Sequence, residues 1–359
     1  MTTSRRRCTS ACNWFIDNGF LTTDKFYILG PCSAESREQV LDTARAIQSS
    51  CGASPFIYRA GAWKPRTNPA SFQGVGEIAL EWLAEVKATL GIPVATEVAT
   101  PEHVGKALAA GIDYLWIGAR TSANPIAVQA LAEALTGANL KGVFIKNPVN
   151  ADADLWLGNI ERLEATGLPV MAIHRGCNHK PCWAMAHKVR TARPDIPMLL
   201  DPSHLTGDAA KIPALMGKIE ELGLDGAMVE VHCDPAHALS DNVQQITPSL
   251  LRDTLVSNPC RVRVESVFST TDSSKELNWL RAEIDELDEQ LWDTIAARMD
   301  VSRRIGEWKK ANHVAPLQPK RYQTIVERIN ELTNERGLST DFALKIWELI
   351  HKESLRQQK

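Results

Sequence analysis

The sequence lacks several features that mark whole classes of protein. None of its apolar runs approaches the ~18 residues of a membrane-spanning helix, and the N-terminal stretch TSRRRCTSACNWF is basic without the apolar core of a signal peptide. Positive charge is not in excess, because 40 lysines and arginines are balanced by 43 aspartates and glutamates. These absences predict a cytoplasmic protein that binds neither membranes nor nucleic acid.

Cysteine is sparse and scattered, which favours reduced thiols over a disulfide framework. The eight cysteines are at positions 8, 12, 32, 51, 177, 182, 233 and 260. Cys8 and Cys12 are interpreted as thiols of an N-terminal arm. Cys177, His179, Cys182 and His187 have spacings that match no common zinc motif, so no zinc site is expected there.

Short apolar runs recur along the first three quarters of the chain and alternate with helical segments. Each run is nearly continuous, as expected for a strand buried on both faces. The runs are residues 26–30, 56–60, 93–98, 114–118, 142–146, 169–174, 196–201 and 227–231. The helical segments are near residues 36–49, 75–90, 101–110, 125–135, 155–166, 183–192, 209–222 and 249–257. Eight such units predict a TIM barrel, and the absence of a Gly-rich fingerprint after the first strand argues against a doubly wound sheet.

Composition divides the chain into four predicted parts. Residues 1–24 are an arm without periodicity, 25–265 form the (β/α)8 barrel, and the Ser/Thr-rich residues 266–274 form a linker. Residues 275–359 are predicted to be a small all-α domain of three helices, near 276–311, 320–336 and 340–357.

Potential metal ligands follow three of the predicted strands, and the working groups of a TIM barrel gather at the carboxyl ends of its strands. Cys32 follows the first strand, Asp201 and His204 the seventh, and Glu230 and His232 the eighth, with Asp241 beyond. The mixed sulfur, nitrogen and oxygen set of Cys32, His204, Glu230 and Asp241 suits a divalent Mn, Fe, Co or Zn ion. Strand alternation points His232 away from the same metal as Glu230.

Cations stand at or after the ends of four other predicted strands, and Glu97 stands at the end of the third. The cations are Arg59, Lys64, Arg66, Arg120, Lys146 and Arg175. Guanidinium groups bind phosphate and carboxylate through paired hydrogen bonds, so this set predicts substrates with several negative charges. Lys146 is also a candidate for a Schiff-base lysine, although its cationic neighbours favour anion binding.

The strand-end motifs resemble 3-deoxy-D-arabino-heptulosonate 7-phosphate (DAHP) synthase of the short type I-beta branch. They are GPCS (30–33), KPRT (64–67), IGAR (117–120), RG (175–176), DPSH (201–204), VEVH (229–232) and LSD (239–241). The resemblance implies metal-dependent condensation of phosphoenolpyruvate with erythrose 4-phosphate, with Cys32, His204, Glu230 and Asp241 as ligands. It places Arg120, Lys146 and Arg175 on phosphoenolpyruvate, Arg59 and Lys64 near the reacting atoms, and Arg66 and Thr67 on the erythrose 4-phosphate phosphate.

Two points stay open in this comparison. Glu97, Lys146 or a metal-bound group is a candidate to assist the water that adds to the intermediate. His174 and Thr121-Ser122 differ from residues frequent in this branch. The alternative is a 3-deoxy-octulosonate 8-phosphate synthase. The KPRT motif at 64–67 favours DAHP synthase over this alternative.

The helical tail carries an apolar seam at 277, 284, 291 and 305 that Arg298 interrupts, and an unpaired cation on such a seam is costly. Arg281 and Lys309 lie roughly 40 Å apart on one helix, so a shared ligand requires an antiparallel second copy. Leu280-Arg281, Ala297-Arg298, Gly306-x2-Lys309, Lys320-Arg321 and Ser354-x3-Gln358 resemble an AroQ-type chorismate mutase, an intertwined dimer.

That resemblance implies rearrangement of chorismate to prephenate. Arg281 of the second copy, Arg298 and Arg321 are expected at the carboxylates, Lys309 and Gln358 at the ether oxygen, and Ser354 nearby. Gln318 and Tyr322 stand where relatives often have acidic or amide residues, which alters the expected contacts to the substrate hydroxyl.

Together the two resemblances predict a bifunctional enzyme of the shikimate pathway that is at least a homodimer. The arm has no room for a separate regulatory domain, so feedback by prephenate through the tail is hypothesised. The alternative is an octulosonate-type barrel with a catalytically silent helical tail for dimerisation or sensing.

Overall fold

The computed structural model describes residues 25–358 except 53, 67, 258–272 and 316–318. The predicted arm, Thr67, Gln318, the thiols of Cys8, Cys12 and Cys260, and most of the predicted linker therefore lie outside the described residues. The chain divides into two compact units after Glu283. The predicted domain boundary near Lys275 remains a prediction, eight residues before that division. None of the described helices is both long and apolar enough to cross a membrane.

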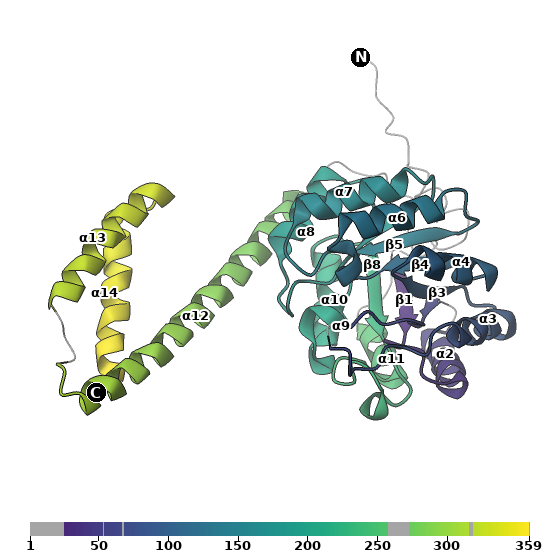
Figure 1. Ribbon diagram of the computed structural model, residues 1–359, viewed down its shortest axis with the longest axis horizontal. Coiled ribbons are helices and arrows are strands. Elements are labelled where there is room, and N and C mark those ends of the chain that lie inside the picture. The colour runs from purple at the N-terminus through teal and green to yellow at the C-terminus, as the bar shows by residue number, and fades with distance from the viewer. Residues whose placement is uncertain (1–24, 53, 67, 258–272, 316–318, 359) are drawn as a thin grey trace, which may run out of the picture. The chain divides into compact units, whose positions relative to one another are not determined.

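Eight parallel strands close into a barrel in the order of the chain, which confirms the predicted fold (Figure 1). The strands are β1 (Phe26–Gly30), β2 (Ile57–Arg59), β3 (Val94–Val98), β4 (Tyr114–Ile117), β5 (Gly142–Lys146), β6 (Val170–His174), β7 (Met198–Leu200) and β8 (Gly226–Glu230). Closure comes from the pairing of β1 with β8, in which Gly30 is opposite Glu230. Every strand residue is buried, because side chains fill the barrel on one side and helices cover the other.

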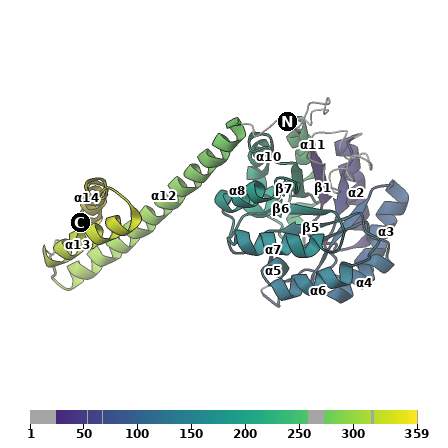
Figure 2. The same ribbon diagram turned by 90° about the horizontal axis from the view of Figure 1, so that it is seen from above.

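Helices ring the strands, as the view from above shows (Figure 2). They are α2 (Arg37–Cys51), α3 (Ile78–Leu90), α4 (Pro101–Ala109), α5 (Ala119–Ser122), α6 (Pro125–Leu135), α7 (Ala153–Glu164), α8 (Trp183–Ala192), α9 (Pro202–Thr206), α10 (Ile212–Glu221) and α11 (Pro248–Ser257), with 3-10 turns η1 (Ala209–Lys211) and η2 (Pro235–His237). Several begin as local chemistry requires: Thr100 and Asn124 cap α4 and α6 with their side chains, and a proline follows each.

Two predicted helices differ in extent from the observed ones. The segment predicted at 75–90 becomes helical at Ile78, because Gly74 and Gly76 adopt the left-handed backbone that helices avoid. The segment predicted at 209–222 splits into η1 and α10, since a proline near the start of α10 removes the backbone donor that a continuous helix would use.

The hydrophobic core has two layers. One fills the barrel interior and includes Phe26, Ile28, Tyr114, Trp116 and Phe144. The other lies between the strands and the surrounding helices and extends to Trp279 and Ala282 at the start of α12. The barrel interior is thus packed with side chains below the strand ends, and chemistry is left to the groups that follow those ends.

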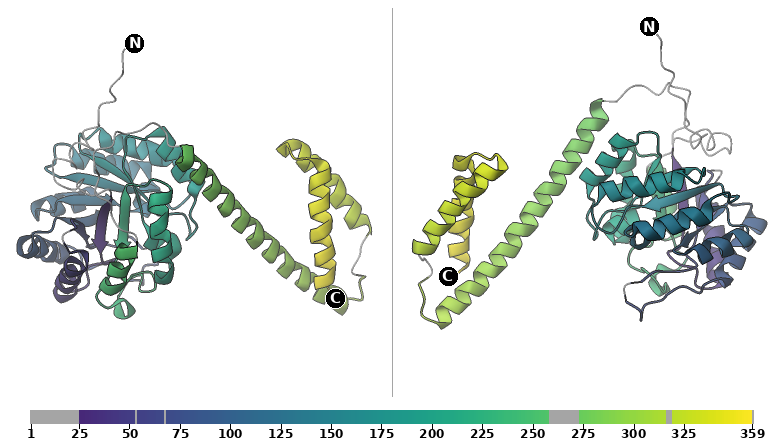
Figure 3. Two further views of the ribbon diagram at one scale, coloured as in Figure 1. Left: turned by 180° about the vertical axis from the view of Figure 1, so that it is seen from behind. Right: turned by 45° about the horizontal axis from the view of Figure 1, so that its top comes forward.

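Three helices complete the chain: α12 (Ser273–Ala311), α13 (Pro319–Arg336) and α14 (Thr340–Gln357). They match the three predicted helices to within three residues at each end. In the second unit α13 and α14 lie side by side (Figure 3). Gly337 has a positive φ of 63° where the chain leaves α13.

Candidate functional site

The pairing of β1 with β8 and β2 brings the first groups of the barrel site together. Cys32 follows β1, Glu230 ends β8, and Arg59 ends β2. Gly30 permits this close approach. It has a φ of +150°, and a Cβ at this position would lie 2.0 Å from the carbonyl oxygen of Arg59. A side chain at Gly30 would therefore push apart the two strands that carry Cys32 and Arg59.

Three of the four predicted metal ligands form one cluster. A ligand atom from each of Cys32, Glu230 and Asp241 lies within 4.8 Å of the others. The Cys32 thiol donates to Asp241 Oδ2 at 3.0 Å, and Nε2 of His204 lies 3.6 Å from Glu230 Oε1. Asp241 has a positive φ of 48°, an unfavourable conformation for a non-glycine residue that is often found at functional sites. The geometry therefore gathers all four predicted donors.

Neighbouring groups fix the orientation of these donors. Asp201 accepts from Nδ1 of His204, with Oδ2 at 2.9 Å, which leaves Nε2 facing the cluster. Gln244 donates to Glu230 Oε2 at 2.7 Å, and Gln245 Oε1 accepts from the Cys32 backbone amide at 2.9 Å. Metal-binding histidines and carboxylates are commonly held in this way.

Asp201 thus contacts the site through His204, although the sequence also made it a candidate ligand. Sequence reasoning missed Gln244 and Gln245, and no sequence signal distinguishes these glutamines from surface residues.

Electrostatics in the cluster follow from its burial. Burial raises the pKa of the Cys32 thiol, and the neighbouring Glu230 carboxylate raises it further. Although burial alone would raise the pKa of Asp241, the nearby Lys64, His204 and Arg66 lower it below its ordinary range. A carboxylate at Asp241 beside a protonated thiol at Cys32 leaves one proton that a metal ion would displace.

Arg59 is the most unusual cation of the site. Its side chain is 0% exposed, and Nη2 lies 3.2 Å from Glu230 Oε1 and 3.3 Å from the Cys32 carbonyl oxygen. Its guanidinium lies over the Trp116 ring at 4.7 Å. Within the described residues, its Nε and Nη1 have no hydrogen-bond partner. Buried donors without partners are costly, so these two nitrogens, which carry three N–H groups, are available for an anion.

Lys64 and Lys146 differ in their surroundings. Lys64 Nζ donates to the Cys32 carbonyl oxygen at 3.2 Å and lies 3.5 Å from Glu97. Burial works against its charge, but Cys32 and Glu97 outweigh burial and raise the pKa of Lys64. Lys146 Nζ lies 2.7 Å from Asp201 Oδ2, and burial lowers the pKa of Lys146. Lys64 therefore lies beside the donor Cys32, and Lys146 lies beside Asp201, which contacts the donor His204.

The remaining predicted cations of the barrel are less engaged with this cluster. Arg66 forms an ion pair with Asp241 Oδ1 at 3.0 Å, so it lies at the edge of the site. Arg175 is half-buried, and its backbone amide donates to Asn147 Oδ1 at 2.7 Å. Arg120 is exposed on α5.

The alternative groups noted in the sequence lie elsewhere. His179 contacts the carbonyl oxygen of His204, and His187 lies between Glu276 and Glu283. Cys177 packs near Asn147. His232 accepts from the Asp234 backbone amide, so it lies outside the donor cluster. Among the described residues, Cys32, Glu230 and Asp241 form the only group of three or more potential ligands.

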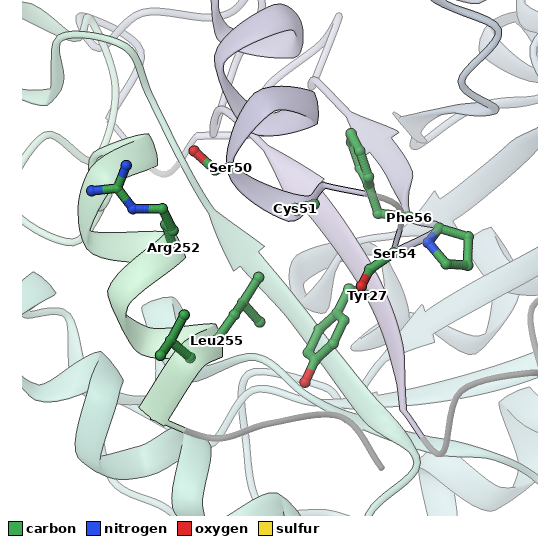
Figure 4. Close-up of a pocket in the computed structure, with 9 residues that line it drawn as sticks. Tyr27, Ser50, Cys51, Ser54, Phe56, Arg252 and Leu255 are labelled. Carbon is green, nitrogen blue, oxygen red and sulfur yellow. The ribbon is translucent and has the colours of Figure 1, made fainter. Parts of the chain in front are cut away.

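A separate cavity of about 260 Å³ lies at the amino end of β2, away from the donor cluster (Figure 4). Tyr27, Cys51, Phe56, Arg252 and Leu255 are among its lining residues. Burial raises the pKa of the Cys51 thiol to about 12, so this thiol is not a reactive nucleophile near pH 7. The cavity therefore offers no reactive cysteine.

In the second unit, two polar pairs join α12 to α14. The guanidinium of Arg298 donates to the hydroxyl of Ser354, and Lys309 Nζ donates to Gln358 Oε1 at 2.9 Å. A Cβ at Gly306 would lie 2.7 Å from the Cα of Gln358, so glycine permits this close packing. The structure therefore brings together four of the predicted mutase residues.

The other predicted mutase residues are not part of these pairs. Arg321 is exposed on α13, and Arg281 is exposed on the part of α12 that belongs to the first unit. Tyr322 packs edge-on against Trp347, with ring centroids 4.8 Å apart. Of the three arginines predicted to bind carboxylates, Arg298 alone therefore takes part in these pairs within the described residues.

Comparisons with known proteins cover both units. Residues 22–264 match the model of the DAHP synthetase I family, and residues 280–359 match chorismate mutase type II. A phospho-2-dehydro-3-deoxyheptonate aldolase of Thermotoga maritima is 32% identical over 245 residues, which cover 66% of this chain and 69% of that protein. A 2-dehydro-3-deoxyphosphooctonate aldolase of Azoarcus sp. is 30% identical over 237 residues, which cover 60% of this chain and 83% of that protein.

Solved structures agree with the synthase match. The crystal structure of the Thermotoga maritima DAHP synthase has a TM-score of 0.57 at 28% identity, over 65% of this chain and 67% of that one. A truncated form of the synthase from the same organism has a TM-score of 0.55 at 25% identity, over 65% of this chain and 85% of that one. The chain therefore belongs to the DAHP synthetase I family and carries, in addition to its synthase barrel, a chorismate mutase domain of type II.

Proposed function

We propose that the barrel condenses phosphoenolpyruvate with erythrose 4-phosphate to DAHP at a divalent metal ion, and that the helical domain rearranges chorismate to prephenate. The observation that carries the barrel reaction is the fully buried Arg59 guanidinium, which contacts the donor Glu230 through Nη2 and has two further nitrogens without partners among the described residues. This juxtaposition fits an anionic substrate held next to a metal ion.

The donor set fits such an ion in number and in kind. Cys32, His204, Glu230 and Asp241 would supply one sulfur, one nitrogen and carboxylate oxygens, a combination suited to Mn, Fe, Co or Zn. When bound, the ion supplies Lewis-acid polarisation of the aldehyde carbonyl. Asp201 keeps His204 in the tautomer whose Nε2 is free to bind, and Gln244 holds the second oxygen of Glu230.

The cations then have separate tasks in the proposal. Arg120, Lys146 and Arg175 hold the phosphate and carboxylate of phosphoenolpyruvate, and Arg66 with Thr67 holds the erythrose 4-phosphate phosphate. Arg59 and Lys64 lie near the reacting atoms, and fixing two anions in position removes most of the entropic barrier to their condensation. Glu97, which is 3.5 Å from Lys64, and Lys146 are the two side chains proposed to assist addition of water.

One set of assays tests the barrel function. Purified protein is given phosphoenolpyruvate with either erythrose 4-phosphate or arabinose 5-phosphate, each with and without a chelator. We expect product when phosphoenolpyruvate is supplied with erythrose 4-phosphate and none when it is supplied with arabinose 5-phosphate. Chelation should abolish this product, and addition of a divalent ion should restore it. Preference for arabinose 5-phosphate would favour the octulosonate reaction of the Azoarcus relative, and full activity in chelator would remove the metal from the proposal.

The mutase proposal depends on a second copy of the chain. Arg281 of that copy, together with Arg298 and Arg321, would surround the two carboxylates of chorismate. The second unit exposes a row of large apolar side chains on α12, including Ile284 (58% exposed), Leu287 (62%) and Leu291 (51%). A helix of a soluble protein rarely leaves such a row in water, which supports a homodimer through this domain.

Lys309 tests the mutase reaction. Rearrangement needs no acid or base, so catalysis comes from holding one conformer and stabilising charge on the ether oxygen. Lys309→Ala should reduce prephenate formation by about a hundredfold or more, by analogy with the loss of one donor to a developing oxyanion. Unchanged prephenate formation in this variant would support a tail that only assembles the protein or senses a ligand.

We further propose that prephenate bound at the helical domain inhibits the synthase. The coupling is tested by comparing inhibition in the full chain with inhibition in a chain that ends at Glu283. A chain cut at Ser274, the end of the predicted linker, would lack Trp279 and Ala282, which belong to the buried core of the first unit. Equal inhibition of the two proteins would dispose of the proposal.

A further inference from the structure

His351 lies on the face of α14 that meets the two cations of α12. Residues three, four and seven apart share one face of an α-helix, so Trp347, His351 and Ser354 form one column along α14, and Gln358 follows them at the C-cap. Ser354 contacts Arg298, and Gln358 contacts Lys309. The imidazole of His351 is therefore placed one turn from the first of these pairs.

Two aromatic rings hold the imidazole in position. Trp347 stacks on it with ring centroids 4.9 Å apart and an interplanar angle of 15°, and Tyr322 meets it edge-on at 5.3 Å. Its Nε2 is buried, yet no group in the described part of the chain forms a hydrogen bond with this atom. A buried nitrogen without a partner is costly, so a rigidly held one beside a binding site indicates a hydrogen bond made to a ligand.

The charges around His351 favour its neutral form. Burial lowers the pKa of His351, and the cations Arg298 and Lys309, both on α12, lower it further. From α13 it faces the phenol ring of Tyr322. A neutral imidazole has one donor and one acceptor nitrogen, which suits a hydroxyl group, whereas carboxylates are matched by the cations.

We propose that His351 binds the ring hydroxyl of the mutase substrate through Nε2. The inference rests on the proposed rearrangement of chorismate, whose polar groups are two carboxylates, an ether oxygen and one hydroxyl. Arginines take the carboxylates in that proposal, and Lys309 with Gln358 takes the ether oxygen. The hydroxyl is the remaining group. A hydrogen bond between His351 and this hydroxyl would make the residue a determinant of substrate specificity.

A matched pair of variants separates hydrogen bonding from ring packing. His351→Phe keeps a flat ring between Trp347 and Tyr322 but has no nitrogen, whereas His351→Gln keeps hydrogen-bonding groups without the ring. We expect kcat/KM for chorismate to fall about ten- to a hundredfold in the Phe variant, because a bound hydroxyl would lose its partner. The Gln variant should stay within a few-fold of the wild type. Equal melting temperatures show that both variants fold.

An analogue of chorismate with hydrogen in place of the ring hydroxyl identifies the bonded group. Wild type and His351→Phe should process this analogue with equal kcat/KM. A Phe variant as active on chorismate as the wild type overturns the inference, and so does a deficit that persists on the analogue, which would assign His351 to packing or to another substrate group.

Failure of the mutase proposal itself is recognised separately, by absence of rearrangement in the wild type. Calorimetric binding of prephenate, which keeps a ring hydroxyl, then carries the test. We expect His351→Phe to bind prephenate with a higher Kd than the wild type, and His351→Gln to stay close to the wild type. Equal Kd values for wild type and His351→Phe overturn the inference.

Discussion

The carboxylate of Asp201 lies 2.9 Å from Nδ1 of His204, so a side chain outside the donor cluster determines which histidine nitrogen faces it. The same carboxylate binds Lys146 Nζ at 2.7 Å. Burial raises the pKa of Asp201, but His204 and Lys146 more than offset burial and hold this pKa well below its ordinary value. Asp201 therefore joins the proposed metal ligands to a proposed substrate-binding lysine.

Replacement of Asp201 by asparagine should weaken metal binding. An amide can donate to Nδ1, which would favour the tautomer with its proton on Nε2, the nitrogen that must bind the ion. We expect affinity for Mn²⁺ or Zn²⁺ to fall about 10- to 100-fold, measured by titration against a competing chelator. Asp234→Asn, at a 58% exposed side chain paired with His237, is the matched control and should bind normally. Unaltered affinity in Asp201→Asn would assign Asp201 to folding alone.

Gly30 should tolerate no side chain. Gly30→Ala places a methyl group 2.0 Å from the Arg59 carbonyl oxygen, and the barrel strands leave little room for movement. We expect the free energy of unfolding to fall by about 3 kcal/mol or more, measured by denaturant titration.

Gly105 provides the opposite case for the same measurement. It lies inside α4, and a Cβ there would meet nothing within 4 Å. Gly105→Ala should raise the free energy of unfolding by about 0.5–1 kcal/mol, because alanine favours the helix. A Gly30→Ala protein as stable as Gly105→Ala would show that β1 and β2 can separate without cost.

Acid should destabilise the barrel in part through His174. Burial lowers the pKa of His174 from 6.5 to about 4, so between these values the unfolded chain binds a proton that the folded chain does not. Stability from this residue is complete above pH 6.5 and is lost as the pH falls toward 4. The loss is about 3 kcal/mol by linkage.

The measurement compares unfolding free energies at several pH values between 4 and 7. His174→Gln should show a shallower decline than the wild type over this window. His237→Gln, which changes an exposed histidine (84% accessible), is the matched control for the substitution itself. Parallel curves for all three proteins would mean that His174 does not titrate differently in the folded chain.

The strand pattern and strand-end motifs predicted the barrel and its donor groups because both are local properties of the sequence. Continuous apolar runs identify buried strands, and closure of a parallel sheet places Cys32 beside Glu230. The roles of Asp201, Gln244 and Gln245 depended on side-chain directions that periodicity does not contain. His351 was missed for the same reason, since a lone histidine on an amphipathic helix acquires meaning only from Tyr322 and Trp347 around it.

Trp279 explains the difference between the domain boundary predicted from composition, near Lys275, and the division of the two compact units after Glu283. The Ser/Thr-rich stretch suggested a linker that ends near residue 274, yet Trp279 at the start of α12 is only 4% exposed. It stacks on His187 at 5.3 Å, meets Trp183 edge-on at 5.9 Å, and donates from Nε1 to the Leu222 carbonyl oxygen at 3.1 Å. Sequence alone could not show that the first turns of the long helix pack into the core of the barrel unit.

These contacts predict that the barrel unit needs the start of α12. A chain that ends at Ser274 would lose the buried indole. We therefore expect its free energy of unfolding to be about 3–5 kcal/mol lower than that of a chain that ends at Glu283. Trp279→Ala in the longer chain should reproduce most of this loss, whereas Leu280→Ala, at a 45% exposed position next to it, should cost far less. The measurement is urea unfolding followed by tryptophan fluorescence and circular dichroism. Equal stability of the two truncated chains would separate α12 from the barrel and restore the boundary near Lys275.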